Sequence, residues 1–218
     1  MRRLVTIVLL MMSPVLTLAQ GSGRAGNWDF SIGAIYQDRE TSNGVGGSSL
    51  AIDDALGLGF NIGYNFTNKL SLGADFDFLR PDYTAIIVNV NDPNDTRRID
   101  HTLSQFNGRF KGTFNFLDGP FTPFVEIGAG WTYIDSNVAN GPPITGCWWD
   151  PWWGERCALF YNTFTSTDFT YGGGLGLRYE FAGGSFIRGN FSVYKLDTGS
   201  NSADPELRSF RVEYGWRF

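Results

Sequence analysis

The sequence predicts an all-β fold, an eight-stranded antiparallel up-and-down transmembrane β-barrel. Eight segments alternate between apolar and polar residues, as expected for strands with one face on lipid and the other on a barrel interior. Short and long connections alternate between these segments, a pattern that soluble sandwiches have no reason to follow. A soluble lipocalin-like barrel is the structural rival, but it would expose Phe110, Phe114 and Trp216 to water.

The first alternating segments lie in the N-terminal half of the chain. Residues 28–37 carry Trp28, Phe30, Ile32, Ala34 and Tyr36 on one face, and residues 56–66 follow the same rule with glycines and asparagines between the apolar positions. In residues 70–78 the apolar positions oppose Asp75 and Asp77. Residues 106–116 are the clearest case, because every second position is Phe or Gly and the others include Arg109 and Lys111.

Four segments complete the predicted barrel. They cover residues 125–133, 169–181, 187–193 and 207–218, and the segment 187–193 has the weakest alternation. The last one places Phe210, Val212, Tyr214, Trp216 and Phe218 on one face. A soluble sheet rarely carries three aromatic residues where chains fray, whereas a barrel must seal its last strand against lipid. We expect Tyr214, Trp216 and Phe218 to form a C-terminal signal for the barrel-assembly machinery.

The connections predict which end of the barrel faces which side. Short turns occur at 67–69, 117–120 and 182–185, and long polar segments occur at 40–53, 80–99, 135–166 and 197–206. Bacterial outer-membrane barrels have short periplasmic turns and long extracellular loops. We therefore expect both termini on the periplasmic side. Pro123, which lacks an amide hydrogen, is expected at the periplasmic rim, where one lost ladder bond is tolerable.

Residues 1–19 have the features of a signal peptide. Met1-Arg2-Arg3 is basic, residues 4–12 are nearly all apolar, and Thr17-Leu18-Ala19 supplies small residues before the expected cleavage. An uncleaved anchor is the alternative, although the apolar run is shorter than the ~20 residues of a spanning helix. We expect cleavage after Ala19 and one barrel domain over residues 20–218.

Composition limits the partners. Loss of Arg2 and Arg3 with the leader leaves 15 basic and 22 acidic residues, a net charge of −7, which disfavours nucleic-acid binding. Aromatic residues make up 16% of the chain and glycines number 28, yet long apolar runs are missing from the mature part. Alternation explains this combination, because polar residues of a barrel interior interrupt every apolar stripe.

The leader, the alternating strands, the segment from Tyr171 to Phe181 with glycines at 172, 173, 174 and 176, and the terminal Phe218 together resemble a known family. These features are similar to those of small eight-stranded outer-membrane barrels, the surface-antigen-like group related to the barrel domain of outer-membrane protein A. The resemblance implies a monomeric or weakly associated protein of a Gram-negative outer membrane, surrounded by lipid. Members include structural anchors, adhesins and narrow-pore proteins. We expect a structural or surface-interaction role, with a narrow channel for ions or small solutes as the alternative.

The strand faces opposite the apolar ones carry six acids and six bases. These are Asp29, Asp75, Asp77, Glu126, Glu180 and Glu213 with Arg109, Lys111, Arg178, Arg188, Arg211 and Arg217. The interior of an eight-stranded barrel is only wide enough for its own side chains, so these charges must pair with one another or with trapped water. They are interpreted as an ionic plug, and a narrow ion path through them is the alternative.

The longest loop contains Cys147-Trp148-Trp149-Asp150-Pro151-Trp152-Trp153-Gly154-Glu155-Arg156-Cys157. Two cysteines in an exported chain predict a disulfide between Cys147 and Cys157, which would stabilise local structure by about 2 to 3 kcal/mol. Trp148, Trp149, Trp152 and Trp153 could contact a host or cell-surface ligand. Alternatively they pack as a cap over the barrel mouth or rest at the lipid interface. In either case the loop should be ordered.

We expect no catalytic, cofactor-binding or metal site. The glycines at 172–176 lie in a strand without the Lys-Ser or Lys-Thr of a nucleotide loop. Oxygen ligands at Asn89, Asn91, Asp92, Asn94 and Asp95 do not match the EF-hand spacing. Some eight-stranded barrels modify lipid A with a histidine, a serine and an acid, but the sole histidine, His101, lacks the His-x-Ser spacing, and Ser104 should face the other side of the strand.

Overall fold

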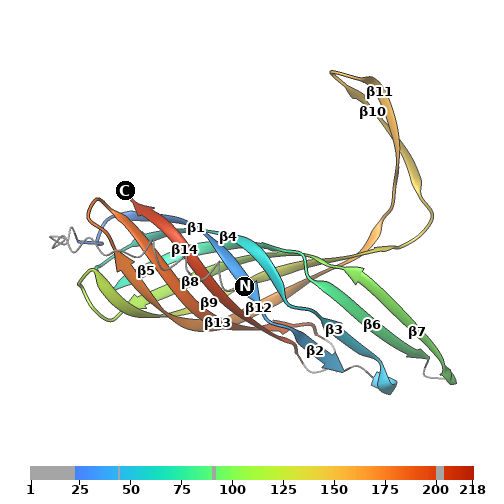
Figure 1. Cartoon of the computed structure of the whole chain (residues 1–218), viewed down its shortest axis with the longest axis horizontal. Coiled ribbons are helices and arrows are strands. Elements are labelled where there is room, and N and C mark those ends of the chain that lie inside the picture. Colours follow the sequence, from blue (N-terminus) through green and yellow to red (C-terminus); the bar gives the residue numbers. More distant parts are fainter. Residues whose placement is uncertain (1–22, 44, 90–91, 200–203) are drawn as a thin grey trace, which may run out of the picture.

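The computed structural model describes residues 23–43, 45–89, 92–199 and 204–218. Eight antiparallel strands form a closed barrel in the order β1-β14-β13-β12-β9-β8-β5-β4 (Figure 1). Their bounds are β1 (Trp28–Gln37), β4 (Ala55–Asn65), β5 (Leu70–Leu79), β8 (Ser104–Asn115), β9 (Phe121–Ala139), β12 (Thr163–Glu180), β13 (Ser185–Asp197) and β14 (Glu206–Arg217). The fold-class prediction is confirmed. The structure has no helix among the described residues that is long and apolar enough to cross a membrane.

The barrel is closed by the pairing of its first and last strands. The β1–β14 ladder runs from Asp29 opposite Arg217 to Gln37 opposite Ser209. At its end the Trp28 amide donates to the Phe218 carbonyl (2.8 Å) and the Phe218 amide donates to the Trp28 carbonyl (2.9 Å). The predicted terminal strand therefore lies in the wall with a neighbour on each side.

The two faces of the wall follow the predicted alternation. On β8 the even-numbered Phe106, Phe110 and Phe114 point outward, whereas Arg109 and Lys111 are buried inside. Aromatic residues also gather toward both ends of the outer wall, with the rings of Tyr214 and Trp216 4.9 Å apart at one end and those of Phe78 and Phe106 4.9 Å apart at the other. This arrangement is the pair of aromatic girdles that flank the apolar band of membrane barrels.

Short connections lie at one end of the barrel, which we call the turn end. The side chain of Thr67 accepts hydrogen bonds from the Lys69 amide (3.1 Å) and the Leu70 amide (2.9 Å) and so closes the first turn. In the third turn Gly183 and Gly184 have φ angles of 102° and 85°, which favour glycine. Pro123 is the third residue of β9, next to the second turn, and its carbonyl accepts a hydrogen bond from the Phe116 amide (3.0 Å).

The long connections differ from the expected polar loops, because much of their length is β-structure. At the opposite end, which we call the hairpin end, β2 (Glu40–Asn43), β3 (Ser49–Ile52), β6 (Asp82–Asn89) and β7 (Asp92–Thr102) form a four-stranded sheet in the order β2-β3-β6-β7. A short 3₁₀ turn, η1 (Val45–Gly47), joins β2 to β3. Strands β10 (Ile144–Asp150) and β11 (Gly154–Phe160) form a separate hairpin.

Burial explains the ordered sheet at the hairpin end. Ile52, Tyr83 and Leu103 form a buried cluster, and Ile134 and Val138 from the extended end of β9 pack against it. The apolar residues of these connections are thus covered by a strand that continues beyond the barrel, a contact that strand periodicity in the connections alone does not reveal.

The closed ladder predicts resistance to detergent. Every barrel strand has a hydrogen-bonded neighbour on both sides. Sodium dodecyl sulfate therefore has no unpaired strand edge from which to unfold the sheet until heat opens the barrel. Unheated and boiled samples of the outer-membrane fraction should therefore migrate differently on a detergent gel. Identical migration, or recovery of the folded chain without detergent, would contradict the membrane barrel.

Candidate functional site

Eight buried charged side chains meet in the middle of the barrel and form what we call the central network. They come from five strands and are Asp75, Asp77, Arg109, Lys111, Glu126, Arg188, Arg211 and Glu213. The alternation of inward and outward positions places them there, because each occupies the polar face of its strand.

The central network crosses the interior. Arg211 on β14 donates from Nη2 to both carboxylate oxygens of Asp77 on β5 (2.6 and 2.7 Å), although β1 and β4 separate these strands in the wall. Arg109 also pairs with Asp77. Lys111 Nζ lies 2.7 Å from Asp75 Oδ1 and 3.4 Å from Glu126 Oε2. These contacts link opposite parts of the wall through the lumen.

Further contacts fill the same region. Arg188 donates from Nε to Glu213 (2.6 Å), and Asn190 donates to Glu126 (2.5 Å). The Arg109 guanidinium lies 4.1 Å from the ring centre of the buried Tyr194. Aromatic rings and paired charges therefore occupy the lumen together.

A second group of charges lies toward the turn end. Arg178 on β12 donates to Asp29 on β1 (2.5 Å) and to Glu180 (2.8 Å), and Arg217 donates to Glu180 (3.0 Å). The Arg178 guanidinium lies 3.9 Å from the ring centre of Phe186. All twelve charges placed inside by sequence analysis therefore lie on the interior face, with Arg217 only partly buried at the end.

Arg24, which precedes β1, is a member of this group that sequence analysis missed. Its side chain donates to Glu180 (2.6 Å) and to the carbonyls of Asn68 (2.9 Å), Leu117 (2.9 Å) and Gly119 (2.7 Å). One guanidinium thus joins the first two turns to β12 across the turn end and is 1% exposed. No periodicity marks Arg24, because it lies outside the strands.

The second candidate site is the β10–β11 hairpin. Cys147 and Cys157 lie directly opposite each other in its ladder and form a disulfide, which confirms the predicted bridge. The tip is closed by Asp150, whose Oδ1 accepts hydrogen bonds from the amides of Trp152 (2.8 Å) and Trp153 (3.1 Å). Gly154 follows with a φ of 74°. The bridge and the turn together give the tip a defined conformation.

Four exposed tryptophans surround this tip. Trp148, Trp149, Trp152 and Trp153 are 47%, 76%, 82% and 69% exposed. The guanidinium of Arg156 lies 5.6 Å from the ring centre of Trp153. The hairpin projects away from the barrel mouth (Figure 1), so the tryptophans do not form the cap considered in the sequence analysis.

The histidine and the serine considered in the sequence analysis lie on successive strands, β7 and β8. His101 is exposed on β7, and its Nδ1 accepts a hydrogen bond from the Thr102 amide (2.9 Å), while Ser104 begins β8. Within the described ranges, one cluster has metal-ligand geometry, Cys147 with Glu155 and Cys157, but both thiols are consumed in the disulfide. Asn91 lies outside the described residues.

The glycines at 172–176 lie in β12, as the sequence predicts. A Cβ at Gly172 would lie 2.1 Å from the Val193 carbonyl oxygen, so this glycine permits the close approach of β12 and β13.

The closed barrel, its lipid-facing aromatic girdles and its polar interior define a membrane-spanning β-barrel protein. The chain belongs to the outer membrane protein beta-barrel domain family, whose model matches residues 5–218. It is therefore an outer-membrane barrel protein. Because short turns face the periplasm in such barrels, we expect the turn end on the periplasmic side and the hairpin end outside the cell. A search of curated proteins found no match.

Solved structures show the same fold at low sequence identity. Ail, the attachment invasion locus protein of Yersinia pestis, in complex with the heparin analogue sucrose octasulfate, is 16% identical, with 89% of this chain and 99% of Ail covered and a TM-score of 0.52. OprG of Pseudomonas aeruginosa is 13% identical, with 92% and 99% covered and a TM-score of 0.55. Neisserial surface protein A is 13% identical, with 88% and 96% covered and a TM-score of 0.50.

The central network predicts a large effect of removing one arginine. Arg211→Met removes a guanidinium that pairs with Asp75, Asp77 and Glu213. These three buried carboxylates then lose a neighbouring positive charge. We expect the free energy of unfolding to fall by about 3–5 kcal/mol. Urea unfolding in lipid vesicles, followed by tryptophan fluorescence, measures the change.

Arg208→Met is the matched control, because Arg208 lies on the same strand but is exposed and pairs with the partly exposed Glu206 (3.3 Å). Its expected change is within about 0.5 kcal/mol. Equal changes for the two variants would show that the crossing ion pairs do not hold the barrel together.

Proposed function

We propose that the protein is a monomeric, non-enzymatic outer-membrane anchor that presents a rigid tryptophan-rich hairpin to a partner at the cell surface. The observation that carries this proposal is the exposure of four tryptophans at the tip of a disulfide-closed hairpin that projects from the barrel. Leader cleavage after Ala19 and recognition of Tyr214, Trp216 and Phe218 by the assembly machinery belong to the same proposal.

Physical chemistry supports a binding role for this tip. Tryptophan is enriched among residues that dominate binding energy, because its large ring buries much apolar area and loses little conformational entropy. The disulfide and the Asp150 turn restrict the hairpin before binding, and such preorganisation reduces the entropy lost on association.

The chemistry of the tip favours an apolar or ring-bearing partner surface. Residues 147–157 contain four tryptophans, one base (Arg156) and two acids (Asp150 and Glu155), so the tip has no net positive charge. Ail was solved with a sulfated heparin analogue, but this hairpin lacks the cluster of basic residues that would attract such a polyanion. We propose instead a sugar face or an apolar protein surface of a host or neighbouring cell.

The double variant Trp149→Ala/Trp152→Ala tests the proposal. Because central tryptophans often contribute 2 kcal/mol or more to binding, we expect about 30-fold weaker adhesion of displaying bacteria to cultured cells or immobilised matrix. Heat-dependent gel migration should remain unchanged. The matched control is Tyr161→Ala/Phe164→Ala, which removes two exposed aromatic residues from the same arm below the tip. Unchanged adhesion of the tip variant would refute the binding role.

A narrow channel is the second candidate function. Its support is that the buried polar atoms Ser31 Oγ, Thr170 Oγ1 and Tyr194 Oη have no hydrogen-bond partner among the residues that the structure describes, so water would satisfy them. The paired charges across the lumen oppose continuous passage of ions.

Planar-bilayer recordings distinguish the two functions. The anchor predicts no steady single-channel conductance from the wild-type barrel. The channel predicts steps whose size or selectivity changes in Arg109→Gln or Glu126→Gln, since both side chains line the interior. Reproducible wild-type steps that respond to these changes would replace the anchor with the channel.

A further inference from the structure

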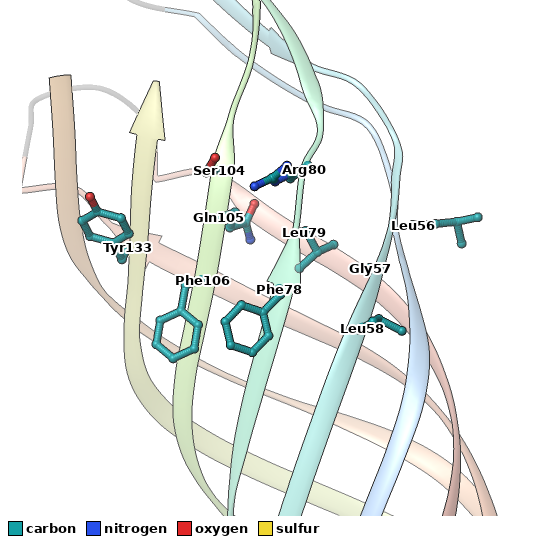
Figure 2. Close-up of a pocket in the computed structure, with 10 residues that line it drawn as sticks. All are labelled: Leu56, Gly57, Leu58, Phe78, Leu79, Arg80, Ser104, Gln105, Phe106 and Tyr133. Atoms are coloured by element: carbon teal, nitrogen blue, oxygen red, sulfur yellow. The ribbon is translucent and has the colours of Figure 1, made fainter. Parts of the chain in front are cut away.

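A groove lies on the lipid-facing wall near its hairpin end. It is a cavity of about 400 Å³, within the range of small-ligand pockets, and it opens over β4, β5, β8 and β9 (Figure 2). Its lining includes Leu56, Leu58, Phe78, Phe106 and Tyr133 on the outward face, with Arg80 and Ser104 above them.

The lower part of the groove is apolar and well supported. The rings of Phe78 and Phe106 lie 4.9 Å apart on neighbouring strands and form its floor. Behind the floor, Leu79 packs with Ile35 and Ala55 in a buried cluster inside the barrel. The groove therefore ends at this cluster on the inside and opens on the lipid-facing side of the wall.

The upper rim of the groove carries a positive charge. Arg80 directly follows β5 and is exposed, and Figure 2 shows its side chain above Phe78 and Phe106, extending toward Ser104. Within the described part of the chain Arg80 makes no ion pair, whereas Arg39 pairs with Asp53 (2.8 Å) and Arg98 pairs with Asp100 (2.8 Å). A cation at the boundary between apolar band and aqueous loops is suited to a lipid phosphate.

We propose that this groove binds one anionic, phosphate-bearing lipid of the outer leaflet. The acyl chain lies on Leu58, Phe78 and Phe106, and the phosphate accepts hydrogen bonds from the Arg80 guanidinium and the Ser104 hydroxyl. The apolar floor matches the acyl chain of such a lipid, and the cationic rim matches its phosphate. The rim lies nearer the end of the barrel than the floor does, as a headgroup lies outside its acyl chain in a bilayer. The site is independent of the tryptophan hairpin, so failure of either proposal leaves the other intact.

Native mass spectrometry of the full chain in nonionic detergent tests the proposal. Phosphatidylglycerol and phosphatidylcholine with identical chains serve as probes, because the choline cation neutralises the second headgroup. We expect one phosphatidylglycerol per barrel, bound about fivefold more tightly than phosphatidylcholine, and about fivefold weaker binding by Arg80→Gln. The control Arg98→Gln removes an extracellular arginine already paired with Asp100 and should bind as the wild type does.

A short-chain phosphatidylglycerol separates the groove from simple phosphate binding. It carries the same headgroup but cannot fill the apolar floor, so we expect at least about tenfold weaker binding than for the long-chain lipid. Equal binding of both lengths would reduce the site to a surface phosphate contact and overturn the groove. Equal binding by Arg80→Gln and wild type, with the heat-dependent gel shift intact in both, would overturn the site as a whole.

Discussion

Hydrocarbon offers no hydrogen-bond partners, and this constraint determines the architecture of the chain. Each backbone amide and carbonyl at membrane depth must be satisfied within the protein, so a sheet can cross the bilayer only if its first and last strands pair. Here β1 and β14 complete that closure along nine residue pairs, from Asp29–Arg217 to Gln37–Ser209. Once the sheet is closed, the pleat sends alternate side chains to lipid and to the lumen, and the two faces acquire opposite chemistry.

The lumen then raises a second problem, because eight strands enclose little space for water. Charges that point inward are desolvated, and they are tolerated only with partners. Arg211 with Asp77, and Arg178 with Asp29, satisfy this condition by joining strands that are not neighbours in the wall. The same contacts that compensate the charges therefore brace the barrel from inside, and Arg24 extends them to the first two short turns.

Sequence reasoning succeeded where a local rule applies. Period-two alternation identified the barrel strands and both faces, including the interior positions of Asp75, Arg109 and Glu213, because one residue of slip would reverse every side chain. The cysteine spacing indicated the disulfide. Features that depend on distant parts of the chain were missed. Arg24 has no periodic context, and the ordered sheet over β6 and β7 depends on its packing against the extended end of β9.

The lipid groove was also beyond sequence reasoning, because it is formed where the ends of β5 and β8 meet. Leu79 and Gln105 form the last residue pair between these two strands toward the hairpin end. Arg80 and Ser104 are the residues next to this pair, one on each strand's continuation. Only the register between the strands places the two together.

The two surface features place aromatic residues in different environments, and this difference bears on their roles. Phe78 and Phe106 face lipid, so their exposure from the protein carries no hydration penalty in the membrane. The four tryptophans of the hairpin lie at a tip that bends away from the barrel and are exposed there, and apolar rings are disfavoured in water. Folding does not bury them, and the disulfide holds them near one another at the tip. A partner surface that covers these rings would bury apolar area that folding leaves exposed, so the proposed binding role gives these tryptophans a physical reason that fold stability does not.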